Sequence, residues 1–420
     1  NTLDANTTAS NNTAIGSQAL NANTTGASNT AVGHNSLLTN STGTLNAAFG
    51  QSTLKLNTTG SYNTSLGAHS MMKNTTGIEN VVVGTSAMED NTTGDGNTAV
   101  GRSALANNTT ADSNTAVGRQ ALQANTTGTN NVALGAYSLD ANTTASHNTA
   151  IGTNALTLNT TGASNVSVGR GSLGNNSTAS NNTAVGDMAL NANTTGTNCT
   201  AVGTNALDAS NGNNNSAVGK GALGANTTGI NNTAVGKDAL ESNTTADNNT
   251  AVGSDALTAN TTGYENVAVG SEALDANTTG FVNTAVGHGA LGANTDAGRN
   301  TAIGKDALAA NTTGERNTSV GHDSLLANTT GDYNSALGQN ALAANTTASG
   351  NSAFGNSALD VNTTGGNNTA IGVNSLGSNT TASNNTAVGN SALGANTTGT
   401  RNVAVGANAL DANTTADDNT

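Results

Sequence analysis

The fold is decided by the stretch Asn249–Glu265, NTAVGSDALTANTTGYE, which the next seventeen residues, Asn266–Val282, repeat as NVAVGSEALDANTTGFV. The glycine that closes AVG marks each copy, from Gly16 to Gly406. There are 24 such glycines, and their spacing is 17 residues except for one step of 16. Self-similarity at a fixed short period is typical of repeat proteins, in which each unit packs mainly on its neighbours. We therefore expect residues 1–420 to form one continuous repeat array rather than several globular domains.

The composition argues against an ordinary globular core and against nucleic-acid binding. The chain has no Pro and no Trp, and only three Phe and four Tyr. Its net charge is −14, from 25 acidic and 11 basic residues, and the basic residues form no cluster of the kind that binds nucleic acid. The single cysteine, Cys199, allows no intrachain disulfide, and we interpret it as one interrupted position in a column of asparagines.

The apolar columns predict the core when the repeat is numbered from Asn249 as position 1. Position 4 is always apolar and position 9 is Leu or Met, so we expect Val252, Val269, Leu257 and Leu274 to face inward. Position 2 is Thr, Val, Ser or Ala and lies two residues before position 4, so we expect it to face inward too, in the alternation of a β-strand. Position 3, nearly always Ala or Ser, is then expected to face outward, close to a packing partner. Position 8 is equally small.

The invariant polar and glycine columns predict turns. Glycine at position 5 indicates a backbone turn with positive φ. Position 15 is Gly or Ala, which argues against an obligatory positive φ there. Asparagines at positions 1 and 12 suit corners and can hydrogen-bond from coil to coil as ladders. The asparagine column includes Asn12, Asn29, Asn249 and Asn266, and the glycine column includes Gly16, Gly33, Gly253 and Gly270.

These columns predict an all-β fold, a parallel β-solenoid or β-roll of about 24 coils with one 17-residue repeat per coil. The apolar spacing does not fit a helix, and Gly, Asn and Thr are poor helix formers. Positions 6, 7, 10, 16 and 17 vary freely, so we expect them to face solvent. One coil buries little apolar surface, so stability requires stacking. We also expect lateral association, as a trimer, or stacking into a filament.

The NTAVGxxAL unit resembles the repeats of trimeric autotransporter adhesin heads, and the longer NTAVGxxALxxNTTG unit resembles repeats of bacterial and phage tail-fibre-like proteins. The resemblance covers essentially the whole chain. It implies a parallel β-roll, often trimeric, on an extracellular fibre. The 17-residue period is longer than that of the adhesin heads, and no chaperone, stalk or anchor segment is present, so trimerisation is implied by resemblance alone.

Several short motifs predict no chemistry in this context. The G-x-G-x-x-G pattern of Gly169–Gly174 and its two other copies combine the position-5 glycine with glycines at free positions, without the helix of a dinucleotide site. The five histidines lie far apart in variable columns, and no calcium-binding glycine-aspartate repeat occurs. We expect no cofactor, no metal and no enzymatic activity. The histidines are His34, His69, His147, His288 and His322.

The NTT tripeptide matches the N-glycosylation acceptor in most coils. The favoured interpretation is a corner asparagine followed by a threonine ladder. The alternative is a rod that carries glycans, although a spacing of about 4.8 Å between coils would crowd a sugar at every position. The candidate glycosylation sites are Asn6, Asn23, Asn57, Asn260 and Asn277.

The repetition favours a structural role, as a rigid shaft or filament on or outside the cell or on a virion. The expected partners are copies of the chain itself, with no nucleic acid and no membrane span in this segment. An adhesin or receptor-binding fibre is one alternative, but aromatic and charged residues look scattered. Ice binding through the threonines of positions 13 and 14 is another. Both ends fall inside a repeat without a cap, so we expect a segment of a longer chain.

Overall fold

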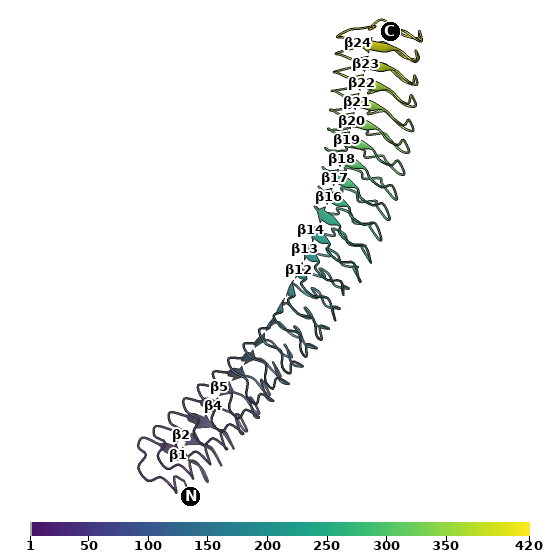
Figure 1. Cartoon of the computed structure of the whole chain (residues 1–420). Helices are drawn as coiled ribbons and strands as arrows, with labels where there is room; N and C mark the ends of the chain where they lie inside the picture. The colour runs from purple at the N-terminus through teal and green to yellow at the C-terminus, as the bar shows by residue number, and fades with distance from the viewer. Residues whose placement is uncertain (1) are drawn as a thin grey trace. The chain divides into compact units, whose positions relative to one another are not determined.

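The computed structural model describes residues 2–420, and within this range it contains 24 three-residue strands and no helix. Coils of about 17 residues stack on one another with one strand in each coil (Figure 1), which confirms the predicted all-β solenoid. The chain divides into two compact units, one ending at Asn211 and the other beginning at Gly212. This division falls inside the one repeat that is a residue short.

Each unit carries twelve strands. The strands of the first unit are β1 (Thr13–Ile15), β2 (Thr30–Val32), β3 (Ala47–Phe49), β4 (Thr64–Leu66), β5 (Val81–Val83), β6 (Thr98–Val100), β7 (Thr115–Val117), β8 (Val132–Leu134), β9 (Thr149–Ile151), β10 (Val166–Val168), β11 (Thr183–Val185) and β12 (Thr200–Val202). The strands of the second unit are β13 (Ser216–Val218), β14 (Thr233–Val235), β15 (Thr250–Val252), β16 (Val267–Val269), β17 (Thr284–Val286), β18 (Thr301–Ile303), β19 (Thr318–Val320), β20 (Ser335–Leu337), β21 (Ser352–Phe354), β22 (Thr369–Ile371), β23 (Thr386–Val388) and β24 (Val403–Val405).

Successive strands within a unit are parallel and in register. In β15 and β16, Thr250 pairs with Val267 and Ala251 pairs with Ala268. Backbone hydrogen bonds between neighbouring coils continue outside the strands, as from the Leu257 amide to the carbonyl of the next coil at 3.0 Å. Because most of each coil is bonded to its neighbours, the stack continues in register from coil to coil.

The strands face the opposite way from the prediction. Val252 and Val269 are each 37% exposed, whereas Ala251 at position 3 is fully buried. Side chains alternate across a strand, so an inward position 3 places positions 2 and 4 outside. The expectation that positions 2 and 4 face the core is therefore wrong, as is the expectation that position 3 faces outward. The interior side of the strand is filled by the small position-3 residues, mostly Ala, with Val82 the one buried valine in this column.

Leucine and asparagine fill the interior together with alanine. Leu257 and Leu274 are fully buried, which confirms the prediction for position 9. Ala256 at position 8 is also fully buried, so the small columns lie inside their own coil rather than between chains. Asn260, the position-12 asparagine of the same coil, is buried beside them.

The glycine column forms the predicted turn. Gly253 has φ of +143° and Gly270 has φ of +141°, a region that L-residues rarely adopt. A Cβ atom on Gly270 would lie 2.5 Å from the backbone carbonyl oxygen of Gly287 in the next coil. Gly263 at position 15 has no positive φ, and Ala246 occupies the same column one coil earlier. Position 5 therefore requires glycine and position 15 does not.

Candidate interaction surface

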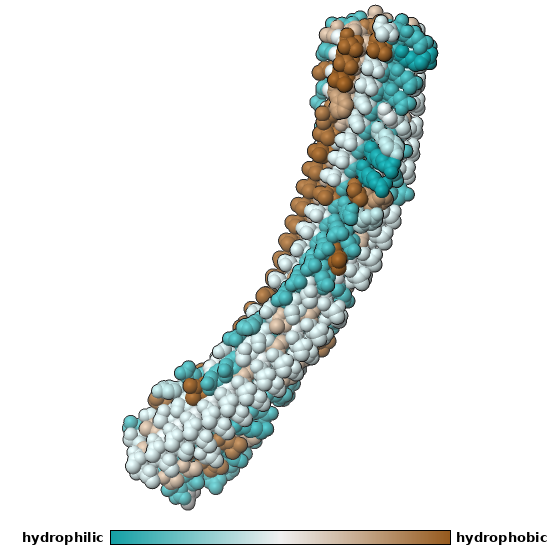
Figure 2. All heavy atoms as spheres, viewed as in Figure 1, coloured by the Kyte–Doolittle hydropathy of each residue, from teal (hydrophilic) through white to brown (hydrophobic). Residues whose placement is uncertain are grey.

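The outward face of the strands carries two columns of side chains, at positions 2 and 4 of the repeat. We call this surface the strand face. Position 4 is Val, Ile, Leu or Phe in every strand, and position 2 is Thr, Val, Ser or Ala. The apolar side chains form a row along the strands of the second unit (Figure 2), and even bulky Phe354 is 38% exposed. Contiguous exposed apolar surface of this kind is typical of interaction sites.

The asparagine ladders lie behind the strand face, inside the coils. The side-chain amide of Asn277 donates to Oδ1 of Asn260 at 2.9 Å and to the Gly280 carbonyl at 3.0 Å. Asn266 donates through its backbone amide to Oδ1 of Asn249 at 3.0 Å and through its side chain to the same Gly280 carbonyl at 2.8 Å. The two columns therefore meet at one carbonyl in each coil. This confirms the predicted ladders, which are buried and satisfied by hydrogen bonds.

The same geometry holds at the beginning of the array. The backbone amide of Asn29 donates to Oδ1 of Asn12 at 2.9 Å, and its side chain donates to the Gly43 carbonyl at 2.8 Å. Gly16 and Gly33 have φ of +122° and +136°. The first coils therefore use the same asparagine and glycine contacts as the coils of the second unit.

The candidate glycosylation sites are mostly inside the solenoid. Asn23, Asn57, Asn260 and Asn277 are fully buried, whereas Asn6 in the first coil is exposed. A glycan is attached to the side-chain amide nitrogen, and in the four buried residues that nitrogen donates two hydrogen bonds. A sugar on any of these four side chains would replace one of the two N–H groups, so at least one of the two hydrogen bonds would be lost, and the coil would have to open to make room for the sugar.

Cys199 occupies the place of a position-1 asparagine and is buried. Its backbone amide donates to Oδ1 of Asn182 at 2.9 Å, as an asparagine at this position does. The residue therefore keeps the backbone half of the ladder contact. Its burial and this bond agree with the interpretation of an interrupted position in the ladder.

The variable positions pair side chains from adjacent coils. Arg170 binds Asp187 at 2.9 Å, and Arg401 binds Asp418 at 2.6 Å, each across a separation of 17 residues. The hydrogen bond from Arg401 lowers the pKa of the Asp418 carboxyl group. These pairs lie on the surface, as expected for free columns, and surface ion pairs contribute little to stability.

Aromatic and arginine side chains gather on five consecutive coils of the second unit. The rings of Tyr264 and Phe281 stack with centroids 5.4 Å apart, and the Arg299 guanidinium lies 5.1 Å from the Phe281 ring. Arg316 lies 5.2 Å from the Tyr333 ring. The expectation that such residues are scattered is therefore wrong for these coils, all of which carry them at positions 16 and 17. Each of the three rings therefore has at least one face in contact with a side chain of a neighbouring coil.

Four of the aspartates at position 10 are half-buried. Burial raises the pKa of Asp140, Asp208, Asp275 and Asp360, and it is the largest influence on each of these carboxyl groups. For Asp275, the nearby carboxylates of Glu272 and Asp255 raise the pKa further. Because no basic side chain contributes to any of the four shifts, this column disfavours negative charge.

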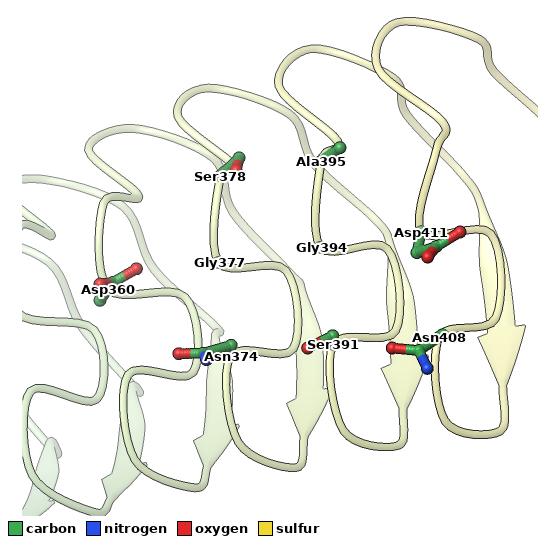
Figure 3. A pocket seen from close by; sticks show the side chains of 9 residues that line it. All are labelled: Asp360, Asn374, Gly377, Ser378, Ser391, Gly394, Ala395, Asn408 and Asp411. Carbon is green, nitrogen blue, oxygen red and sulfur yellow. The ribbon is translucent and has the colours of Figure 1, made fainter.

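A surface hollow of about 490 Å³ lies between Asp360 and Asp411 (Figure 3). It forms where Gly377 and Gly394 occupy position 10, since two consecutive coils then lack a side chain there. The other lining residues are Asn374, Ser378, Ser391, Ala395 and Asn408. None of the lining residues is a histidine, cysteine or lysine, so the hollow holds no pairing of a nucleophile with a histidine base.

Across residues 2–420, no three His, Cys, Asp or Glu side chains come together in a group that could hold a metal ion. The same range contains no helix long and apolar enough to cross a membrane. The expectations of no cofactor, no metal and no catalysis stay predictions.

Serine pairs inside the coils were missed by sequence reasoning, although the sequence contains the signal. Each of the three serines at position 3 occurs in a coil that also has serine at position 8. In β4, Ser65 lies 2.5 Å from Ser70 across the interior, and Ser167 pairs with Ser172 in the same way. This covariation within the chain shows that positions 3 and 8 face each other, and it could have placed position 3 inside.

The sequence was compared with models of known protein families and with curated proteins. No family model matches the chain, and no curated protein matches it significantly. The resemblance to adhesin-head and tail-fibre repeats therefore stays a prediction, and what is established is a tandem-repeat parallel β-solenoid with internal asparagine ladders.

Proposed function

We propose that this chain is a rigid structural shaft, a tandem-repeat scaffold of an extracellular fibre or filament. The observation that carries the proposal is that each coil is bonded to the next around most of its contour. Around Leu257 alone, three amides in the coil donate to the following coil: Leu257 at 3.0 Å, Ala259 at 3.1 Å and Thr261 at 2.9 Å. Bending or stretching a unit would have to distort several such bonds together.

The interior supports a mechanical role. Asparagine side chains bridge coils where a globular core would use large apolar groups, as between Asn260 and Asn277. Hydrogen bonds have preferred distances and directions, so such ladders fix both the rotation and the spacing of neighbouring coils. An array built this way keeps each coil at a fixed distance and rotation from the next, which is what a spacer requires.

We place the shaft on or outside the cell, or on a virion, because the repeat resembles those of adhesin heads and tail fibres. Its partners in this proposal are further copies of the same chain. Glycans are not part of the proposal for the coil interior, since Asn260 and Asn277 use their side-chain amides in the ladder. The role is mechanical rather than catalytic.

An adhesin or receptor-binding fibre is the second candidate, and one observation favours it. The gathering of Tyr264, Phe281, Arg299, Arg316 and Tyr333 on consecutive coils is a distinct patch on an otherwise repetitive surface. It ranks second because Phe281 lies between a tyrosine and an arginine, and its ring faces are used in these contacts rather than offered to a ligand.

Ice binding through positions 13 and 14 has less support. The hydroxyl group of Thr261 at position 13 donates to the carbonyl of Thr278 in the next coil at 3.0 Å. Thr261 is half-buried, whereas Thr262 at position 14 is exposed. Only one of the two threonine columns therefore faces solvent, and a flat two-column lattice does not form there.

Electron microscopy of the isolated protein tests the proposed shaft. The expected result is straight or gently curved particles whose long dimension grows by about 4.8 Å per coil, together with surface labelling of intact cells or virions by an antibody to the repeat. Compact globular particles would contradict the shaft, and labelling only after the cells are opened would contradict the location.

A further inference from the structure

The strand face is a regular, partly apolar surface that the coils themselves leave exposed. Ala251 points into the coil and is fully buried, so its neighbours Thr250 and Val252 both point outward. The pattern repeats in every strand, and it places an apolar side chain at position 4 of each coil at the spacing of a parallel sheet, about 4.8 Å.

The two columns of the strand face differ in the chemical property that their residues share. Position 4 changes size from Val to Leu or Phe but is never polar across the 24 strands. Position 2 is Thr, Val, Ser or Ala, so neither a hydroxyl group nor a constant shape is required there. A surface that matches a rigid lattice would need constant shape, whereas a surface buried against protein needs constant apolarity. The strand face therefore has the character of a packing surface.

The area of one unit reaches the lower limit of a specific interface. Twelve strands stacked at about 4.8 Å extend for about 55 Å, and two outward columns with their side chains make a surface about 10 Å wide. Each partner would then cover about 550 Å², which gives about 1,100 Å² for the pair, just above the roughly 1,000 Å² that a specific interface needs.

The charge pattern favours a second copy as the occupant. The chain carries a net charge of −14, so two copies repel each other on most of their surfaces. Positions 2 and 4 carry no charged residue in any strand, so the strand face is where two copies can meet without opposing like charges. A second copy also presents an apolar row with the same repeat spacing along its whole length.

We propose that a second copy of this chain docks on the strand face and buries the position-4 column. This inference rests on the proposed shaft function, since it names the surface by which shafts associate. Two such faces would pack about 10 Å apart, as stacked sheets do, with side chains of one copy between those of the other. The small columns at positions 3 and 8, which the sequence suggested as the contact, take no part.

The test replaces three adjacent position-4 residues with lysine in the full chain: Val235→Lys, Val252→Lys and Val269→Lys together. All three side chains are partly exposed, so the coil interior is left intact. Sedimentation equilibrium at micromolar concentration should give the unaltered chain at least twice the chain mass of 40.7 kDa and the variant 40.7 kDa. Circular dichroism and electron microscopy of the variant should still show the solenoid.

A matched control places the same three added charges on another face. Asn231→Lys, Asn248→Lys and Val282→Lys change exposed position-17 residues of nearby coils, and Val282 is 41% exposed, much like the position-4 valines. This variant should keep the mass of the unaltered chain. A loss of association in both triple variants would show a general charge effect and would overturn the docking surface.

Other outcomes separate the docking proposal from the shaft. An unaltered chain that is rod-shaped but has the mass of a monomer overturns self-docking and leaves the shaft in place. A chain without a solenoid by circular dichroism and microscopy overturns both. If the monomeric chain shows thermal hysteresis that the position-4 lysines abolish, the strand face binds ice instead of a second copy.

Discussion

At the residue scale, Leu257 shows how burial outweighs backbone strain. Its φ is +53°, in the left-handed region, where an L-residue costs about 1–2 kcal/mol. The residue is nevertheless fully buried, and burial of a leucine side chain contributes about 1.5–3 kcal/mol. The balance favours leucine over glycine because only a large side chain fills the coil interior at position 9.

The position-5 glycine should not tolerate a methyl group. Gly270→Ala puts a Cβ atom at φ of +141° and close to the Gly287 carbonyl, so we expect a loss of stability of at least about 1–3 kcal/mol in urea unfolding. Gly292→Ala at position 10 is the matched control, and we expect it to stay within about 1 kcal/mol of the unaltered chain. Gly292 has no positive φ, a Cβ atom there would lie no closer than 3.2 Å to any neighbouring atom, and Ala309 already occupies that column one coil later. Equal effects at the two positions would contradict the assignment of the turn.

One ladder asparagine can be removed without changing the surface. Asn277→Ala leaves the Gly280 carbonyl and the amide groups of neighbouring coils with fewer buried partners, at a cost of about 1–3 kcal/mol per unsatisfied group. Hydrogen exchange should show faster exchange in the coils on either side. Thr279→Ala, at an exposed position of the same coil, should change neither the stability nor the exchange. A silent Asn277→Ala variant would mean that the ladder is dispensable.

At the scale of the element, the position-10 column makes stability depend on pH. Burial raises the pKa of Asp275 in the folded chain above its ordinary value of 3.8, so the folded state binds the proton more tightly than the unfolded state. Stability from this group is fully present below the unfolded pKa, and it is lost as the pH rises through the folded pKa. The column therefore favours the fold at acidic pH and opposes it at neutral pH.

Removal of this carboxylate should raise stability at neutral pH only. Asp275→Asn keeps the size of the side chain without its charge, so its unfolding midpoint should exceed that of the unaltered chain at pH 7. At pH 3 both side chains are largely neutral, and the midpoints should converge. Glu265→Gln, at an exposed position, controls for the loss of one negative charge. A gain that persists unchanged at pH 3 would refute the pH linkage.

At the scale of the whole molecule, the coil is the unit of addition and removal. Each coil contacts mainly its neighbours, so stability is a sum of coil and interface contributions. Deletion of residues 266–282 removes one complete coil and joins Glu265 to an asparagine of the same column. We expect the shortened chain to unfold at nearly the same temperature as the unaltered chain.

A partial deletion provides the contrast. Removal of residues 266–273 alone leaves nine residues of the coil, which are too few to close it in register with its neighbours. We expect a clear fall in the unfolding temperature and increased protease sensitivity near the deletion. Similar unfolding temperatures for the two deletions would show that stability does not depend on the 17-residue register.

The sequence by itself determined the period, the parallel stacking, the glycine turns and the asparagine ladders. These features repeat along the chain, and each follows from local chemistry: positive φ requires glycine, as at Gly253, and stacked amides bond to one another, as at Asn260 and Asn277. A property that every coil shares can be inferred from any one coil.

Only the tertiary structure decided which way the strand faces. An alternation of Thr250, Ala251 and Val252 fits either direction, and hydrophobicity favoured placing valine inside. The interior of the coil, already filled by leucine and asparagine, is occupied at position 3 by alanine in most coils, so the valine of position 4 lies outside; Val82 is the one larger apolar residue buried at position 3. Steric fit across the coil, which depends on residues distant in sequence, outweighed the preference of one side chain for burial, and it created the strand face on which the docking proposal depends.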